Sequence, residues 1–118
     1  MYTYYKEVKV EEHMLYAGEI ANLFKIETIN GLPATNLVSA VLKEYIETLD
    51  DYEQVFYINS HGYKNKVYPA SIYGEAMAAF MTCVINKYPN EDLYLDNEKI
   101  FELKIADKNY KFRLYREI

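Results

Sequence analysis

Hydrophobic residues in the first part of the chain follow two different spacings. Over residues 2–10, apolar and polar side chains alternate, and this period of two predicts a strand with one buried face. Residues 11–26 carry apolar side chains near one helical stripe, which predicts a first helix. The stripe consists of Leu15, Ile20, Leu23 and Phe24. Residues 25–29 fit either the end of that helix or a short strand, and Asn30-Gly31-Leu32-Pro33 predicts a break in regular structure.

The second helix has the clearest pattern in the chain. Over residues 37–49, apolar side chains recur at spacings of three and four, which predicts an amphipathic helix that Thr35 caps and that ends near Asp50. At the centre of residues 54–60, odd-numbered and even-numbered positions are both apolar, which is typical of an interior strand covered on both faces. Residues 63–68 then predict the returning arm of a hairpin.

A third helix is predicted over residues 70–87, which are apolar nearly all round the helix. We therefore expect it to be the most buried helix of the protein. Pro69 suits its first turn, and Pro89 marks its end. Cys83 lies inside this apolar segment and lacks the electropositive, exposed setting of a reactive thiol. The sequence therefore predicts a structural role for Cys83.

The last part of the chain predicts several strands. Apolar residues alternate with polar ones in three segments, residues 93–95, 101–105 and 110–114. The sequence Asp107-Lys108-Asn109 indicates a turn, and an even-residue loop or a bulge keeps the apolar side chains of both neighbouring strands on one face. One register allowed by this hairpin places Glu102 opposite Arg113, a favourable pair of charges.

The order of these elements is roughly β-α-α-β-β-α-β-β-β. A length of 118 residues suits one domain, so we expect residues 1–118 to form a single compact α+β domain. Its sheet is expected to be largely antiparallel, with the helices packed on it. Apolar residues make up 51% of the chain, which is enough to fill a core.

Composition excludes several classes of protein. No run of about 18 apolar residues is present, so no membrane-spanning helix is expected. A single cysteine excludes a disulfide framework and a cysteine zinc site, and two histidines leave little for a metal centre. The four glycines are too scattered for a phosphate-binding loop. We therefore expect no catalytic motif, no metal and no cofactor. The lone cysteine and the lack of a secretory signal favour the cytoplasm.

Carboxylates crowd the end of the second helix. They belong to Glu44, Glu47, Asp50, Asp51 and Glu53, and only Lys43 offsets their charge. Negative side chains at a helix C-terminus oppose the helix dipole, and such a locally unfavourable choice is a mark of functional surfaces. The functional interpretation is a non-enzymatic module that binds a partner protein through a basic surface. The alternative is an ordinary solvated acidic face.

The overall composition is unusual in its charge and its aromatic residues. The formal net charge is −5, and the chain has 14 tyrosines and no tryptophan. Tyrosine suits half-buried strands, but it also gives binding surfaces a large contact area with a polar tip. In this acidic, tyrosine-rich composition the chain is similar to phage-encoded inhibitors of nucleic-acid-binding defence systems. The resemblance implies an inhibitor whose carboxylates occupy the surface where its partner holds phosphates.

A small enzyme or ligand-binding domain is a second interpretation of the sequence. Its pocket would lie between sheet and helices and would be lined by Tyr57, Tyr73 and Glu75. Glu75 is the one acid that interrupts an apolar run, which makes it the best single candidate for acid–base chemistry. A position on the exposed edge of the third helix is the simpler explanation for this residue.

A basic and aromatic patch near the predicted hairpin suggests a third interpretation. Its members are His61, Tyr63, Lys64, Lys66 and Tyr68, and stacking rings with interleaved cations suit single-stranded nucleic acid. A nucleic-acid-binding domain would use Lys64, Lys66, Lys111 and Arg113. Nucleic acid is the less expected partner, because the chain as a whole is acidic. A homo-oligomer is compatible with the sequence.

Overall fold

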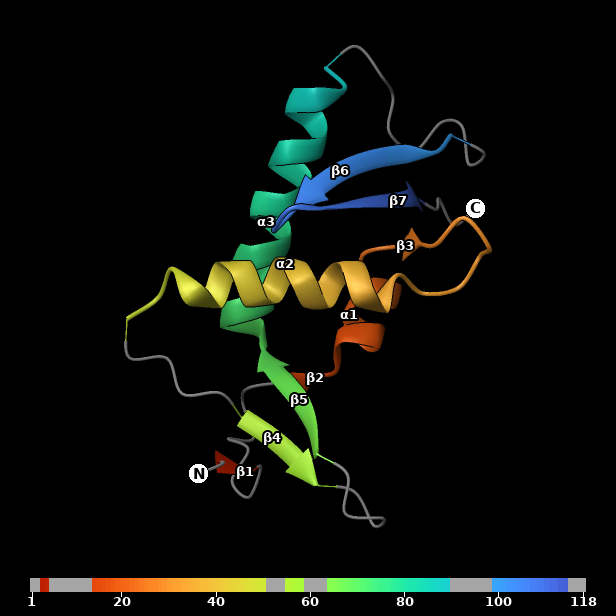
Figure 1. The fold of residues 1–118 in the computed structure, drawn as a ribbon. Helices are drawn as coiled ribbons and strands as arrows, with labels where there is room; N and C mark the ends of the chain where they lie inside the picture. Colours follow the sequence, from red (N-terminus) through yellow and green to blue (C-terminus); the bar gives the residue numbers. More distant parts are fainter. Residues whose placement is uncertain (1–2, 5–13, 51–54, 59–63, 90–98, 115–118) are drawn as a thin grey trace.

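Three helices and two sheets form the part of the chain that the computed structural model describes, residues 3–4, 14–50, 55–58, 64–89 and 99–114 (Figure 1). In chain order the elements are β1 (Thr3–Tyr4), β2 (Met14–Leu15), α1 (Ala17–Leu23), β3 (Ile26–Glu27), α2 (Thr35–Glu47), β4 (Val55–Ile58), β5 (Lys64–Pro69), α3 (Ala70–Lys87), β6 (Phe101–Ile105) and β7 (Lys108–Leu114). The predicted α+β class and the order of the main elements are confirmed. Most of the strand predicted over residues 2–10 and the strand predicted over 93–95 lie outside the described residues.

The described strands form a four-stranded sheet in the order β1-β4-β5-β2 and a three-stranded sheet in the order β3-β7-β6. The predicted hairpin is confirmed, because β4 and β5 are antiparallel with Val55 opposite Val67. β4 lies between β5 and β1, so it is not an edge strand of this sheet. The prediction that both of its faces are covered concerns side chains outside the described residues. β1 runs parallel to β4, and the other pairs are antiparallel. Two sheets thus replace the single sheet that we expected.

The first helix is shorter than the sequence predicts. Met14 and Leu15 form β2, in which they pair with Pro69 and Tyr68 of β5. Helix α1 therefore begins at Ala17 rather than near residue 11. The pairing partner of β2 lies more than fifty positions away in the sequence, so the local apolar stripe could not reveal it.

The ends of α1 have local causes. At its start, the N–H of Tyr16 donates a hydrogen bond of 2.9 Å to Oε1 of Glu19, which is half of a capping box. At its end, Lys25 has a φ of 60° and turns the chain out of the helix. Ile26–Glu27 then forms β3. Leu23, which the predicted stripe places in the core, is exposed.

The loop between β3 and α2 is held by its own hydrogen bonds. The Thr28 hydroxyl accepts hydrogen bonds from the N–H groups of Asn30 and Leu32, at 3.3 and 3.2 Å. Gly31 has a φ of 83° at the predicted break. The prediction that Thr35 caps the next helix is wrong, because Thr35 is already helical and no side chain caps α2.

The amphipathic stripe of α2 is confirmed. Its buried residues are Leu37, Val38, Val41 and Leu42. Tyr45, Ile46 and Leu49 are half-buried and pack against the same core. The helix ends at Glu47, close to the predicted stop. The opposite side of α2 is left for polar residues.

Helix α3 begins and ends where the sequence predicts, but only one of its faces is buried. Its buried residues are Ile72, Tyr73, Ala76, Met77, Phe80 and Val84. On its other side Ile85 is 51% exposed, and Cys83 is exposed as well. The core position implied for Cys83 is therefore wrong. An apolar sequence all round a helix shows how much could be buried, whereas the neighbouring elements decide which face is.

The hairpin of β6 and β7 turns through Ala106 and Asp107, whose φ values are 50° and 66°. Two positive φ values are those of a type I′ turn, whose twist matches that of the flanking strands. Of the two predicted alternatives, an even-residue loop or a bulge, the structure has the even-residue loop. It begins one residue earlier than the predicted turn, since Lys108 is already the first residue of β7.

The register of this hairpin differs from the predicted one. Glu102 lies opposite Lys111, and Arg113 lies opposite Glu27 of β3. The predicted pairing of Glu102 with Arg113 is therefore wrong. The cause is the turn, because its position fixes which residues face each other along both strands.

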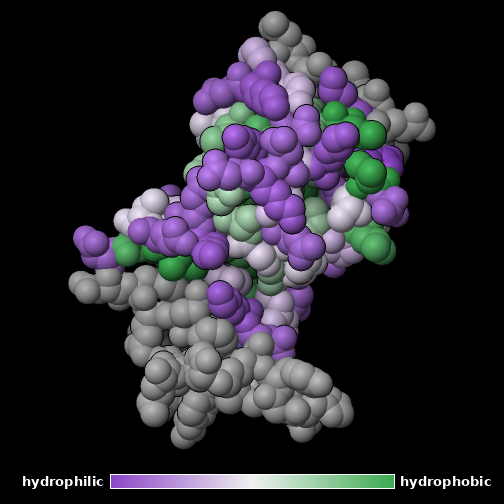
Figure 2. All heavy atoms as spheres, in the orientation of Figure 1, coloured by the Kyte–Doolittle hydropathy of each residue, from purple (hydrophilic) through white to green (hydrophobic). Residues whose placement is uncertain are grey.

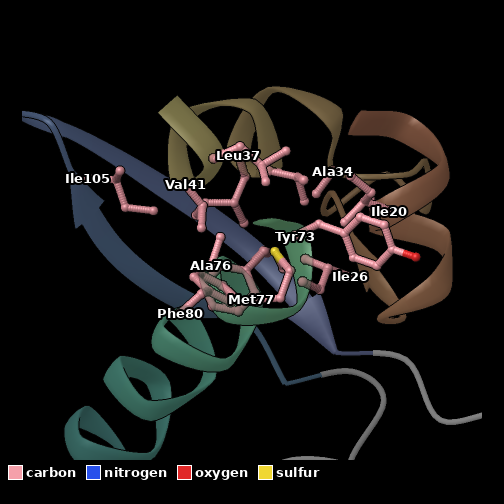
Figure 3. Close-up of a cluster of buried hydrophobic side chains, with 14 of the residues drawn as sticks. Ile20, Ile26, Ala34, Leu37, Val41, Tyr73, Ala76, Met77, Phe80 and Ile105 are labelled. Carbon is pink, nitrogen blue, oxygen red and sulfur yellow. The ribbon is translucent and has the colours of Figure 1, made fainter. Parts of the chain in front are cut away.

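The core joins α2 and α3 to the three-stranded sheet. Phe101 and Phe112 lie opposite each other in the sheet and stack with their ring centroids 5.7 Å apart, and the ring of Phe80 from α3 is 5.4 Å from that of Phe112. In Figure 1, α2 crosses α3, and Figure 3 shows a close-up of buried side chains from these helices and their neighbours. None of the helices described is long and apolar enough to cross a membrane.

Candidate protein-binding surface

Three carboxylates are exposed at the C-terminal end of α2. Glu44 and Glu47 belong to its last turn, and their spacing of three makes them neighbours on the helix surface. Asp50 follows shortly after the helix ends. We call these three residues the acidic end of α2. Within the described part of the chain, none of the three takes part in an ion pair or a side-chain hydrogen bond. Asp51 and Glu53 lie outside the described residues.

The position of these carboxylates is electrostatically unfavourable for the fold. The last turn of α2 contains no basic residue. The unpaired carbonyl groups at a helix C-terminus carry partial negative charge, and a carboxylate beside them costs about 0.3–1 kcal/mol. Glu44, Glu47 and Asp50 are all exposed. Figure 2 shows hydrophilic side chains over much of the coloured part of the face on which α2 lies.

Two hollows flank α2. The larger, with a volume of about 650 Å³, lies between the start of α1, α2 and β5, and Glu47 borders it. The smaller, with a volume of about 250 Å³, lies between α2, α3 and β6, and Glu44 borders it. We call them the α1–α2 hollow and the α2–α3 groove. The two glutamates therefore occupy the part of α2 that separates the hollows.

The α2–α3 groove has an apolar floor. Val41, Ala76, Phe80 and Ile105 line it from α2, α3 and β6, and Figure 3 shows these side chains gathered between the three elements. The remaining apolar lining consists of Tyr45, Ala79, Cys83 and Leu103. The polar lining consists of Glu44, Thr48 and Lys104. The groove thus combines a buried apolar surface with a few polar groups, as binding sites do.

The α1–α2 hollow is more polar. Its lining includes Lys43, Lys66, Thr35 and Ser39, whose side chains carry hydrogen-bond donors. Among the described residues, no ion pair joins either lysine to a carboxylate. The hollow therefore offers donors to a small ligand that carries an anionic group.

The structure does not bring together the residues predicted for an enzyme pocket. Tyr73 is buried in the core, and its ring meets that of Phe24 edge-on at a centroid distance of 6.3 Å. Glu75 is exposed on α3, as expected for the edge of the helix. Neither Tyr73 nor Glu75 lines the α1–α2 hollow or the α2–α3 groove. The side chain of Tyr57 lies outside the described residues.

The residues predicted for nucleic-acid binding are divided between two sheets. Lys66 is exposed on β5, whereas Tyr68 of the same strand is only 4% exposed and cannot stack on a base. Lys111 and Arg113 belong to β7 in the other sheet. His61, Tyr63 and the side chain of Lys64 lie outside the described residues.

Sequence reasoning missed the α2–α3 groove. Its signal was present in α3, where the small residues Ala76, Ala79 and Cys83 follow one another at spacings of three and four and so share one side of the helix. Small side chains on such a strip allow either close packing or an open groove. The sequence does not distinguish close packing from an open groove, because the outcome depends on the distance between α2 and α3.

Within the described residues, no group of three His, Cys, Asp or Glu side chains is arranged to hold a metal ion. Comparisons of the chain with protein families, with curated proteins and with solved structures found no match. The surface of α2 and the hollows beside it are the features of the described residues that could bind a partner or a ligand.

Proposed function

We propose that this protein is a non-enzymatic binding module whose acidic end of α2 contacts a basic surface of a partner protein. One observation carries the proposal. Glu44, Glu47 and Asp50 are exposed and have no ion-pair partner among the described residues, at the helix end where the dipole disfavours them. A cationic partner offsets both the dipole and the mutual repulsion of the carboxylates, so complex formation stabilises an arrangement that is unfavourable in the free protein.

Nucleic-acid-binding proteins offer the basic surface that suits this module best. Their lysine and arginine side chains are placed to neutralise phosphates, and carboxylates compete for the same cations. The net charge of −5 steers the protein toward such a surface. We therefore propose an inhibitor that occupies a nucleic-acid-binding surface, as the phage-encoded inhibitors of similar composition do. The exposed free thiol of Cys83 fits a reducing cytoplasm.

Charge reversal tests the acidic end directly. The double variant Glu44→Lys with Glu47→Lys is compared with the wild type and with Glu75→Lys, a matched reversal on the exposed side of α3. Each protein is immobilised on a resin and incubated with a host lysate. The captured partner is then purified, and its affinity for each variant is measured by calorimetric titration. We expect the wild type and Glu75→Lys to bind the same basic protein and to displace its nucleic acid. The double variant should bind it about tenfold more weakly or worse.

Stability measurements distinguish lost binding from lost folding. Lysine in the last turn of α2 complements the helix dipole, so the double variant should be more stable than the wild type by about 0.3–1 kcal/mol per position. Weaker binding by a more stable protein assigns the effect to the surface. Equal affinity of the wild type and the double variant, or an equal loss in Glu75→Lys, contradicts the proposal.

Small-ligand binding in the α1–α2 hollow is a second candidate function. The volume of about 650 Å³ lies within the roughly 300–1,000 Å³ of small-molecule sites, and the two lysines suit an anionic group. A thermal-shift screen of nucleotides and metabolites tests it. A stabilising ligand whose effect disappears in Lys43→Ala with Lys66→Ala supports this function, and no shift across the library contradicts it.

A further inference from the structure

We infer that the α2–α3 groove takes an apolar side chain of the basic partner, so that the partner presents a leucine, methionine or phenylalanine flanked by lysine or arginine. The inference rests on the proposed function and specifies the chemistry of the partner. It adds an apolar anchor to the charged contact at the acidic end of α2, and the two contacts share one residue, since Glu44 also borders the groove.

The size of the groove suits a side chain rather than a free metabolite. Its volume of about 250 Å³ is below the roughly 300–1,000 Å³ of sites for small molecules. The floor is formed by Val41, Phe80 and Ile105, which are buried in the core and therefore present a surface fixed by packing. Ala79 and Cys83 are exposed along one wall and leave the groove open.

The charges at the rim determine what flanks the apolar anchor. Lys104 lies near a carboxylate, because its Nζ is 4.0 Å from Oδ1 of Asp107, although both side chains are exposed and the pair is weak. Glu44 has no such partner within the described part of the chain. Glu44 is therefore the rim charge that has no opposite charge beside it among the described residues, and it is complementary to a lysine or arginine next to the inserted side chain. An apolar centre with a polar, solvent-accessible rim is the usual arrangement of protein interfaces.

Two model peptides of equal charge separate the groove from the acidic end. They are the acetylated and amidated hexapeptides Lys-Lys-Leu-Leu-Lys-Lys and Lys-Lys-Ser-Ser-Lys-Lys, titrated into the full chain by NMR. We expect both to shift resonances of α2 in a salt-sensitive way. The leucine peptide should bind about tenfold more tightly, because burying one such side chain contributes at least that factor.

Cys83 provides an independent readout of the groove. It is the single cysteine of the chain, so alkylation by iodoacetamide modifies one known position. Near saturation the leucine peptide should slow this reaction severalfold, whereas the serine peptide at the same bound fraction should leave the rate nearly unchanged. Equal alkylation rates with the two peptides overturn the inference.

A pair of substitutions on α3 completes the test. Ala79→Phe places a ring in the groove, and Ala78→Phe places the same ring at the adjacent exposed position, which does not line it. Ala79→Phe should abolish the tenfold preference for leucine while keeping the salt-sensitive binding of both peptides. Ala78→Phe should keep the preference.

The possible results assign failure to one proposal or the other. If both peptides bind the wild type equally, or if Ala78→Phe and Ala79→Phe lose the preference alike, the groove is not the site of an apolar anchor and the acidic end still binds cations. If neither peptide binds the wild type, the acidic end does not recognise basic segments, and the proposed function fails together with this inference.

Discussion

The backbone angles of single residues determine where this chain turns. Gly31 has a φ of 83° in the loop before α2, and an added Cβ there would meet no atom within 4 Å. Its requirement for glycine is therefore conformational rather than steric. Gly74, by contrast, lies on the exposed side of α3, and an added Cβ there would also meet nothing within 4 Å. The two glycines differ in backbone conformation and are alike in surrounding space.

Replacement of each glycine by alanine should therefore change stability in opposite directions. Gly31→Ala should destabilise the protein by about 1–2 kcal/mol, because alanine is strained at positive φ. Gly74→Ala should stabilise it by about 0.5–1 kcal/mol, because alanine loses less backbone entropy in a helix. Urea unfolding of both variants measures the two changes. The same sign for both would show that backbone conformation does not control these positions.

Residue-level signals in the sequence predicted one turn and misplaced another. Asparagine and glycine before Leu32 mark the first break, because glycine is the common residue at positive φ. The hairpin turn through Ala106 and Asp107 has no glycine, although both residues adopt positive φ. The turn begins one residue earlier than predicted, and this displacement explains why the predicted partner of Glu102 was wrong. The exposure of the acids of α2 was predictable from the polar side of its stripe.

At the scale of elements, β6 is protected at its outer edge by the end of α3. The Tyr88 hydroxyl accepts a hydrogen bond of 3.1 Å from the N–H of Glu102 and donates one of 3.5 Å to its carbonyl oxygen. Nζ of Lys87 donates to the same carbonyl oxygen at 2.6 Å. The ring of Tyr88 also meets that of Phe101 edge-on at 4.9 Å. A side chain thus satisfies backbone groups that a neighbouring strand would otherwise pair.

Tyr88→Phe removes the hydroxyl of Tyr88 and keeps its ring. The protein should lose about 1 kcal/mol of stability, because the hydrogen bonds of the hydroxyl are lost. The amide hydrogen of Glu102 should then exchange faster with solvent. Tyr110→Phe on β7 is the matched control, since its hydroxyl has no hydrogen-bond partner among the described residues. Urea unfolding and hydrogen exchange measure both variants, and equal effects of the two would contradict a specific role for Tyr88.

Helices α2 and α3 were predictable as elements because their signals are local. Their apolar spacing and the flanking Pro69 lie within the segments themselves. The start of α1 was not predictable, because β2 forms by pairing with a distant strand. The division into two sheets has the same cause. The α2–α3 groove was not predictable for a related reason, since its width depends on how closely two helices that are distant in the sequence pack.

At the scale of the whole molecule, one cluster of buried residues joins all three helices to the three-stranded sheet and to β5. Leu42 is at 0% exposure in that cluster, whereas Leu32 in the loop before α2 is 63% exposed. The same substitution at these two leucines therefore compares a position inside the shared core with one outside it. Because the cluster includes residues of β6 and β7 as well as α2, a cavity at Leu42 should weaken the fold as one unit.

Leu42→Ala should accordingly reduce the free energy of unfolding by about 2–5 kcal/mol, and Leu32→Ala should change it by less than about 0.5 kcal/mol. Tyrosine fluorescence and far-UV circular dichroism should report the same midpoint in urea for Leu42→Ala, because the sheet and the helices lose their common core together. Midpoints that separate, with helical signal lost before the tyrosine signal, would mean that α2 unfolds by itself. In that case the acidic end and the α2–α3 groove would stand on a helix that can detach from the sheet, and partner binding would have to include the cost of fixing α2 in place.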